Sequence, residues 1–149
     1  MHKKYITKLR EETIKLGERL ARKLKPGSVV ALIGELGSGK TTLVKGIAMG
    51  LGVKNSRYVN SPSFVIIKEY KGKIPLYHFD VFRLDSLNEA DALSFEEYFY
   101  GDGICAVEWA DKIRNLLPKR YIEVKFKIIK GNKREVKIKH QISKIKVTY

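Results

Sequence analysis

The stretch Val29-Val30-Ala31-Leu32-Ile33-Gly34-Glu35-Leu36-Gly37-Ser38-Gly39-Lys40-Thr41 decides the fold of this chain. Residues 29–33 are a continuous apolar run typical of a buried strand, and residues 34–41 match every fixed position of the pattern G-x-x-x-x-G-K-[ST]. Apolar residues then recur at helical spacing at Leu43, Val44, Ile47, Ala48 and Leu51. Strand, glycine-rich loop and helix follow in the order that a phosphate-binding P-loop requires. The sequence therefore predicts a nucleoside triphosphate site and disfavours a glycine-rich turn without chemical purpose.

The chemistry of such a loop explains the residue type at each position. Glycines let the backbone curl so that consecutive N–H groups point inward, which makes an anion-binding nest at the start of a helix. Lys40 is expected to reach the β- and γ-phosphates, Thr41 to offer its hydroxyl to Mg²⁺, and Thr42 to contact phosphate. The predicted nucleotide-binding residues here are Glu35, Leu36, Gly37, Ser38, Gly39, Lys40, Thr41 and Thr42.

Two acidic residues that follow apolar segments are candidates for metal chemistry. Asp80 lies in the aromatic-rich segment 74–84, and a buried carboxylate there needs a metal, a cation or hydrogen-bond donors. Arg83 and Mg²⁺-linked water are alternative partners for the Asp80 carboxylate, and the sequence does not decide between them. The apolar run before Glu108 resembles a Walker-B strand with Glu in place of the usual Asp. Trp109 is expected to pack against the site or shield it.

Other polar residues near these motifs favour structural interpretations. His78 stands among aromatic residues and is interpreted as a hydrogen-bonded core residue. Ser61 and Ser63 could sense the γ-phosphate and metal, because they follow the P-loop helix, but an ordinary turn with a serine cap is favoured. Cys105 is the only cysteine, which excludes a disulfide framework and predicts a small buried side chain.

The remaining pattern predicts one domain over residues 1–149. Leucines at helical spacing predict a helix over residues 7–24. Two S-x-x-E capping boxes, at Ser86 and Ser94, predict short helices within residues 86–99. Further elements are strands over residues 65–70 and 74–84, a short helix over 110–117, and antiparallel, half-buried sheet over 122–147.

The charge of the chain is large and unevenly distributed. Lys and Arg number 30 against 16 Asp and Glu, a formal net charge of +14. Residues 119–149 carry eleven Lys and Arg against two Glu, whereas residues 80–111 carry nine acidic residues and one Arg. The basic end could attract RNA or an acidic protein, or its lysines could be solvated strand faces, and charge leaves both open. Without a signal peptide or an apolar run of about 18 residues, the sequence predicts a cytoplasmic protein.

Taken together, the motifs closely resemble the TsaE (YjeE) family. Four segments carry the resemblance in order: residues 34–42, Ser61-Pro62-Ser63-Phe64, residues 77–84 (YHFDVFRL) and residues 107–111 (VEWAD). The similarity begins at residues 13–17 in the first helix and reaches the basic C-terminal strands. Members of that family are small bacterial ATPases of the machinery that makes threonylcarbamoyladenosine at position 37 of tRNAs reading ANN codons.

The resemblance implies an α/β, P-loop NTPase fold, with three α/β/α layers, a mixed sheet and an antiparallel C-terminal portion. It also implies ATP and Mg²⁺ as cofactors, weak ATPase activity alone, and assembly with the proteins TsaD and TsaB. Contact with tRNA would come through that complex, and direct contact is open. In the family, hydrolysis supports turnover of the complex, and a separate enzyme makes the threonylcarbamoyl-adenylate.

Residue by residue, the resemblance implies catalytic roles for Lys40, Asp80 and Glu108. Thr41 and Glu108 would hold Mg²⁺, with Asp80 assisting the metal or its waters. Thr13 and Lys133 would lie near the nucleotide, and Trp109 near the nucleotide or the partner surface. Two positions depart from the family pattern: Ser63 replaces a usual Thr and keeps the hydroxyl, whereas Phe82 replaces a usual Tyr and loses it.

Three other functions are compatible with parts of the sequence pattern. A small-molecule P-loop kinase is the main alternative, but no arginine-rich lid segment follows the motifs. A GTPase lacks support because no N-K-x-D motif occurs. A basic RNA-binding module is suggested by the lysine-rich C-terminus, although no RNP-type or KH-type signature is present.

Overall fold

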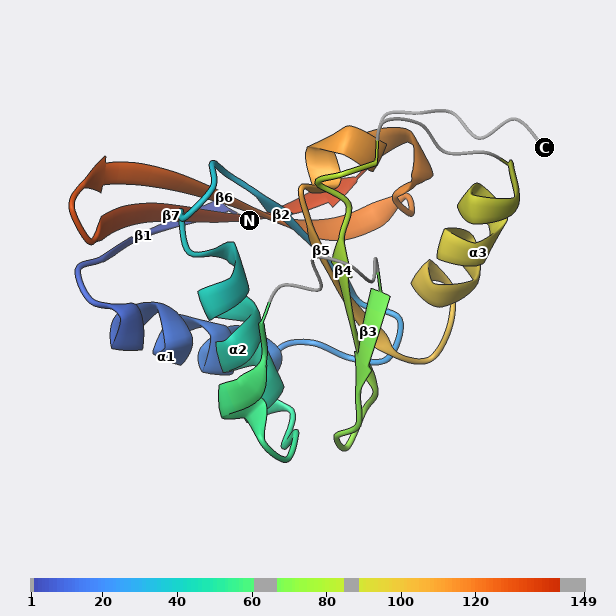
Figure 1. Cartoon of the computed structure of the whole chain (residues 1–149), viewed down its shortest axis with the longest axis horizontal. Coiled ribbons are helices and arrows are strands. Elements are labelled where there is room, and N and C mark those ends of the chain that lie inside the picture. Colours follow the sequence, from blue (N-terminus) through green and yellow to red (C-terminus); the bar gives the residue numbers. More distant parts are fainter. Residues whose placement is uncertain (1, 61–66, 85–88, 143–149) are drawn as a thin grey trace.

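A mixed β-sheet forms the centre of the computed structural model, which describes residues 2–60, 67–84 and 89–142. In the described residues the sheet has seven strands in the order β1-β7-β6-β2-β5-β4-β3 (Figure 1). Strands β6, β2, β5 and β4 run parallel, while β1, β7 and β3 add antiparallel pairs at the edges. The strands are β1 (His2–Thr7), β2 (Val29–Ile33), β3 (Ile67–Tyr70), β4 (Leu76–Asp80), β5 (Ile104–Glu108), β6 (Arg120–Lys130) and β7 (Lys133–Ile142).

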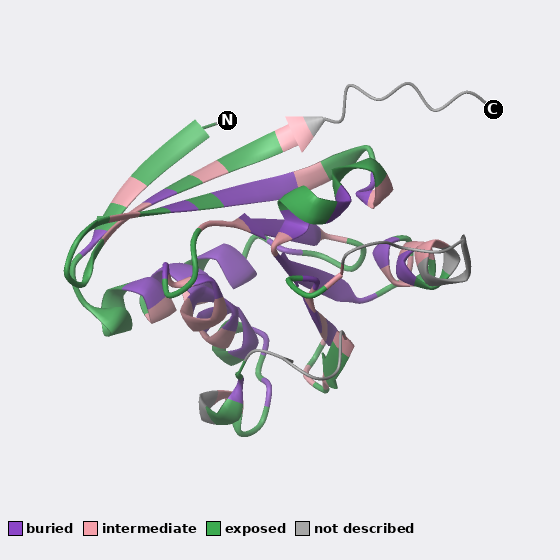
Figure 2. Ribbon diagram, turned by 45° about the horizontal axis from the view of Figure 1, so that its top comes forward, coloured by how far each residue is buried: buried purple, intermediate pink, exposed green. Residues whose placement is uncertain are grey.

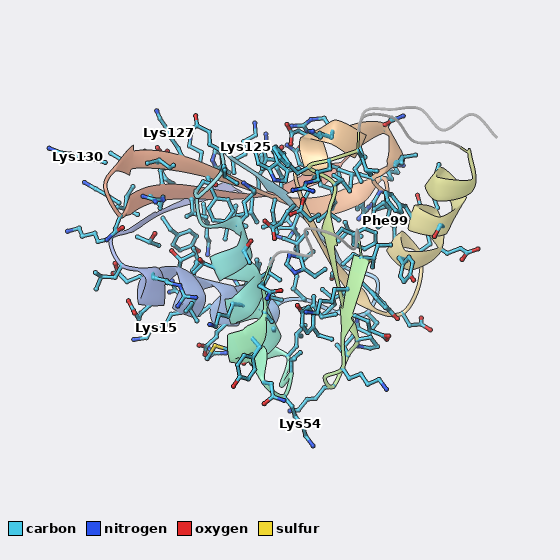
Figure 3. The ribbon with its side chains drawn as sticks, in the orientation of Figure 1. Lys15, Lys54, Phe99, Lys125, Lys127 and Lys130 are labelled. Carbon is cyan, nitrogen blue, oxygen red and sulfur yellow. The ribbon has the colours of Figure 1, made fainter. Side chains whose placement is uncertain are left out.

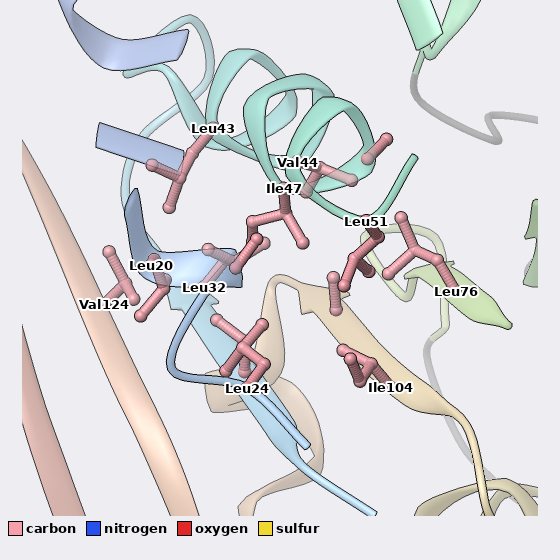
Figure 4. Close-up of a cluster of buried hydrophobic side chains, with 14 of the residues drawn as sticks. Leu20, Leu24, Leu32, Leu43, Val44, Ile47, Leu51, Leu76, Ile104 and Val124 are labelled. Atoms are coloured by element: carbon pink, nitrogen blue, oxygen red, sulfur yellow. The ribbon is translucent and has the colours of Figure 1, made fainter. Parts of the chain in front are cut away.

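Helices cover both faces of this sheet, which confirms the predicted three-layer α/β/α fold. Alternate residues of β2 enter two separate cores: Val30 and Leu32 pack with α1 and α2, and Val29 with residues of α3 and η2 on the other face. Figure 4 shows the first core, and Figure 2 shows how completely β2 and β5 are buried. The helices are α1 (Arg10–Ala21), α2 (Lys40–Gly50) and α3 (Glu89–Phe99), with 3₁₀ helices η1 (Ser56–Tyr58) and η2 (Ala110–Leu116).

Helices α1 and α2 pack at a glycine contact that fixes the helix of the P-loop. A Cβ atom on Gly46 would lie 2.1 Å from the Ile14 carbonyl oxygen, and one on Gly17 would lie 2.4 Å from the Leu43 carbonyl oxygen. Only glycine allows the two backbones to approach this closely. The contact therefore holds α1, which begins beside the P-loop, at a defined distance from α2.

The N-terminal segment differs from the prediction. The predicted helix over residues 7–24 begins only at Arg10, and residues 2–7 form β1, paired antiparallel with β7. Sequence periodicity did not indicate β1, because its pairing partner is distant in the chain. The Glu12 carboxylate starts α1 by accepting the backbone N–H groups of Lys8 (2.6 Å) and Leu9 (3.0 Å), and these hydrogen bonds lower the pKa of Glu12.

Other predicted elements are confirmed with corrected boundaries. The described part of residues 86–99 is one helix, α3. The prediction of a capping box at Ser94 is therefore wrong, because Ser94 lies inside α3. Ser86 lies outside the described residues. The antiparallel C-terminal hairpin is confirmed as β6 and β7, but β6 also pairs parallel with β2. Residues 143–147 lie outside the described residues. Cys105 is buried in β5, where burial raises its thiol pKa to about 12.

Candidate nucleotide and metal site

The P-loop and the two predicted carboxylates meet at one edge of the sheet. The loop connects β2 to α2, and Asp80 and Glu108 are register partners at the ends of the parallel strands β4 and β5. Strand β5 lies between β2 and β4. Because parallel strands end at a common edge, three segments distant in the sequence converge there, which is where open α/β sheets bind ligands.

A cavity of about 470 Å³ lies at this convergence. Its walls come from the start of α1, the P-loop, the first turn of α2, the ends of β4 and β5, and the turn between β6 and β7. Of the predicted site residues, ten line the cavity: Thr13, Leu36, Gly37, Gly39, Lys40, Thr41, Thr42, Asp80, Glu108 and Trp109. The volume is within the usual range for small-molecule sites, about 300–1,000 Å³.

The Lys40 ammonium is held inside the P-loop. It donates to the carbonyl oxygens of Gly34 (2.7 Å) and Glu35 (2.8 Å), and Nζ lies 4.1 Å from the centroid of the Trp109 ring. The side chain is buried, and this burial lowers the Lys40 pKa, while the carboxylates of Glu108, Asp80 and Asp111 oppose the shift. A desolvated cation at this position is well placed to exchange loop carbonyls for phosphate oxygens.

The loop backbone has the conformation that an anion nest requires. Gly37 and Gly39 adopt positive φ angles of 75° and 112°, which other residues rarely adopt. A Cβ on Gly34 would lie 2.6 Å from Ser38 Oγ and 2.9 Å from Phe126 Cβ, so this position also requires glycine. Of the remaining predicted loop residues, Glu35 has an exposed side chain and contributes its carbonyl to Lys40, while Ser38 is buried.

Thr41, Glu108 and His78 form a short polar chain beside Lys40. The Thr41 hydroxyl lies 2.9 Å from both carboxylate oxygens of Glu108. His78 Nε2 lies 2.5 Å from Glu108 Oε2, and the imidazole is fully buried. His78 is thus a hydrogen-bonded core residue, as predicted, and it holds Glu108 in place toward Thr41.

The donor set suits Mg²⁺. Hydroxyl and carboxylate oxygens are the ligands this ion prefers, and it keeps several waters and takes phosphate oxygens instead of filling an all-protein cage. In the described residues no group of three or more His, Cys, Asp or Glu is placed to hold a metal ion, so Thr41 and Glu108 would need a bound phosphate to complete a site. Asp80 is only half-buried and accepts the N–H of Phe82 (2.9 Å), so the assumption that it is buried was wrong.

The β6–β7 turn brings a residue that the sequence analysis missed. Lys133 is exposed and is not among the residues lining the cavity, whereas Arg134 and Asn132 line it. Arg134 Nη2 donates to the Gly37 carbonyl oxygen (3.1 Å). A signal for Arg134 was present, because in a strand it shares a face with Val136, an apolar residue expected to point inward. Leu9 and Arg10, which precede the predicted Thr13, line the cavity as well.

Aromatic residues form the wall near the carboxylates. Trp109 has a left-handed backbone conformation (φ 62°), and its ring lies 4.6 Å from the Phe82 ring. Thr13 is buried, and its hydroxyl lies 3.0 Å from that of Thr7. Phe82 occupies the position where the family usually has Tyr, so the site has no hydroxyl there. The Lys112 ammonium lies 4.9 Å from the centroid of the Phe82 ring. Ser61 and Ser63 lie outside the described residues.

The fold and the site define a P-loop NTPase-type protein, and comparisons with known proteins identify its family. A model for the family "Threonylcarbamoyl adenosine biosynthesis protein TsaE" matches residues 7–136. The chain therefore belongs to the TsaE family. In the described residues no helix is long and apolar enough to cross a membrane.

Individual relatives agree with this assignment. The chain is 46% identical over 127 residues to the tRNA threonylcarbamoyladenosine biosynthesis protein TsaE of Bacillus subtilis, covering 85% of this chain and 78% of that protein. The TsaE of Aquifex aeolicus is 39% identical over 139 residues, covering 91% and 95% of the two chains. The crystal structure of Bacillus subtilis YdiB superposes with a TM-score of 0.77 at 38% identity, covering 96% of this chain and 87% of that one.

Proposed function

We propose that this protein is a Mg²⁺-dependent ATPase of low intrinsic activity that serves the formation of N6-threonylcarbamoyladenosine at position 37 of tRNAs reading ANN codons. One observation carries the proposal: Thr41 and Glu108 meet at 2.9 Å directly beside the buried Lys40, at the mouth of a glycine nest. This arrangement supports the binding of a metal-bound triphosphate. The names of the relatives support the pathway.

Each residue of the site has a distinct part in this mechanism. The loop N–H groups and Lys40 bind the phosphates, and Thr41 and Glu108 would hold Mg²⁺, which when bound neutralises charge that develops on the phosphates. Asp80, register partner of Glu108, is proposed to orient water near the metal. His78 keeps the Glu108 carboxylate turned toward Thr41. Trp109 and Phe82 exclude water from the wall beside Lys40.

We further propose that hydrolysis serves an assembly with TsaD and TsaB. The small-molecule kinase alternative has less support, because no arginine-rich lid segment follows the motifs in the sequence. The resemblance to the TsaE family supports this proposal, because in that family hydrolysis supports turnover of the complex. Contact with tRNA would come through the complex.

Hydrolysis by purified protein tests the proposal. We expect slow release of phosphate from ATP that requires Mg²⁺ and falls at least about tenfold in Lys40→Ala and in Glu108→Ala. Lys54→Ala, an exposed lysine far from the site, is the matched control and should keep wild-type activity (Figure 3). Wild-type activity in Lys40→Ala with retained fold, or transfer of phosphate to an added nucleoside or sugar, would contradict the proposal.

A further inference from the structure

A second groove lies between α1 and the edge strands, away from the nucleotide cavity. Its volume is about 340 Å³, and no residue lines both spaces. Helix α1 packs on α2 through the Gly17–Gly46 contact and lies beside the strands β1, β7 and β6 (Figure 1). The groove is lined by α1 on one side and by these three strands on the other. The first turn of α1 thus serves the nucleotide cavity, and its later turns form one wall of this groove.

The groove has an apolar floor. Leu16 and Leu20 of α1 face Ile122 of β6 and Ile138 of β7 across it. Strand alternation places Ile122 and Ile138 on the sheet face that looks toward α1, together with the buried Val124 and Val136. A floor of this kind can bury apolar side chains of a ligand, at about 25 cal/mol per Å² of apolar surface removed from water.

The rim of the groove is basic. Five basic residues line it: Lys3, Arg19, Arg22, Lys23 and His140. No acidic residue lines it, and in the part of the chain that the structure describes no salt bridge involves any of these five. The groove therefore has excess positive charge over an apolar base.

Neighbouring acidic residues are directed elsewhere. Glu135 of β7 lies on the opposite sheet face, where it pairs with Lys4 (3.4 Å) and Lys137 (3.5 Å). Glu123 of β6 lies on that face too, paired with Arg114 and accepting from Gln141. The Glu12 carboxylate of α1 accepts a hydrogen bond from the Lys8 backbone N–H at the start of the helix. Among the described residues, the groove rim therefore has no ion-pair partner, and only the Arg19 guanidinium has a cation–π contact, with Tyr5.

We propose that this basic groove docks an acidic segment of a partner protein that carries one or two apolar side chains. The complementary charge would steer the segment, and the apolar floor would bind its anchors. RNA suits the groove less well, because Tyr5 is the only Phe, Tyr or Trp that lines it and the Arg19 guanidinium already covers that ring at 5.6 Å. The proposal does not depend on nucleotide chemistry, so the two proposals can fail separately.

Fluorescence anisotropy with defined probes tests the groove. The probe is a fluorescein-labelled pool of 12-residue peptides that alternate Asp or Glu with Leu or Phe. A pool with Lys in place of the acidic residues and a 12-nucleotide oligouridine are the comparisons. We expect the acidic pool to bind best and to bind more weakly at 0.2 M than at 0.05 M salt. NMR shifts should change at Tyr5, Leu20 and Ile138, and ATP hydrolysis should be unaffected.

Charge reversal locates the binding. Arg19→Glu with Arg22→Glu should weaken the acidic pool at least about tenfold. Lys54→Glu with Lys127→Glu changes the net charge equally at exposed positions, and Lys127 lies on the sheet face opposite the groove (Figure 3), so this variant should cost at most about twofold. Equal loss in both variants, no preference for the acidic pool, or tighter binding of oligouridine at the same residues would each overturn the proposal.

Discussion

At the scale of single residues, the position of Glu108 depends on a residue that does not reach the cavity. His78 is fully buried and lies 2.5 Å from Glu108 Oε2, so it orients the carboxylate that faces Thr41. Groups that orient a metal ligand commonly affect metal affinity by about 10–100-fold. Loss of the His78 contact should therefore change the Mg²⁺ concentration that ATP hydrolysis requires.

Replacing His78 should therefore change the Mg²⁺ dependence of ATP hydrolysis. We expect His78→Ala to raise the Mg²⁺ concentration for half-maximal rate by about tenfold or more, since Glu108 loses its orientation. His78→Gln keeps a donor that can reach Glu108 and should recover most of the wild-type midpoint. A purely structural role for His78 would instead leave the Mg²⁺ midpoint unchanged in both folded variants.

Arg134 is a second residue whose role can be measured directly. Its guanidinium donates to the Gly37 carbonyl and lines the cavity, whereas its neighbour Lys133 is exposed. We expect Arg134→Ala to weaken ATP binding by roughly 5–20-fold, because a charge beside the phosphates is lost. Lys133→Ala is the matched control and should change affinity less than twofold, as calorimetry can determine. A larger loss of ATP affinity in Lys133→Ala than in Arg134→Ala would show that the Lys133 assignment from the family resemblance is right.

At the scale of elements, the glycine contact between α1 and α2 limits what the P-loop helix tolerates. A Cβ on Gly46 would lie 2.1 Å from the Ile14 carbonyl oxygen, which no rotamer can relieve. Gly46→Ala should lower the free energy of unfolding by about 1–3 kcal/mol, although alanine favours helices. Met49→Ala, at an exposed position of the same helix, is the control. Thermal unfolding with equal midpoints for the two variants would refute the close contact.

The start of α1 predicts a pH dependence of stability. Hydrogen bonds from Lys8 and Leu9 lower the pKa of Glu12 below its ordinary value of 4.5. Its stabilising contribution is therefore complete above pH 4.5 and is lost as the pH falls through the lowered pKa. Glu12→Gln should reduce the melting temperature at pH 7, and this difference should shrink below pH 4.5. Glu11→Gln, in the same turn, should show a smaller effect at neutral pH. A difference in melting temperature between wild type and Glu12→Gln that grows as the pH falls would contradict this prediction.

At the scale of the whole molecule, the sequence predicted what depends on local pattern. The P-loop, the apolar strands β2 and β5, and the acids at the ends of β4 and β5 were all predicted, because each is encoded in a few adjacent residues. Strand β1 was missed, since its polar residues become a strand only by pairing with β7, as in His2 with Lys139. Arg134 and the basic groove were missed for the same reason. Both depend on which elements the tertiary fold brings together.

The arrangement of the charged residues on the surface likewise becomes clear only from the folded structure. The sequence showed a basic C-terminal end but left its use open. In the structure, strand alternation sends Lys125, Lys137 and Lys139 to one sheet face and His140 to the other, beside Arg19 and Arg22 of α1. Basic residues distant in sequence thus share one groove, while lysines adjacent to them lie on the opposite face with Glu123 and Glu135.

If Lys40, Thr41 and Glu108 form one site for ATP and Mg²⁺, calorimetric titration of ATP with and without Mg²⁺ will show it. We expect wild-type protein to bind ATP more tightly by about tenfold or more when Mg²⁺ is present. Glu108→Gln should lose this gain and keep its Mg²⁺-free affinity, whereas Lys40→Ala should weaken binding in both conditions. A Mg²⁺ gain that survives in Glu108→Gln, or wild-type protein that binds no ATP at millimolar Mg²⁺, would contradict the account.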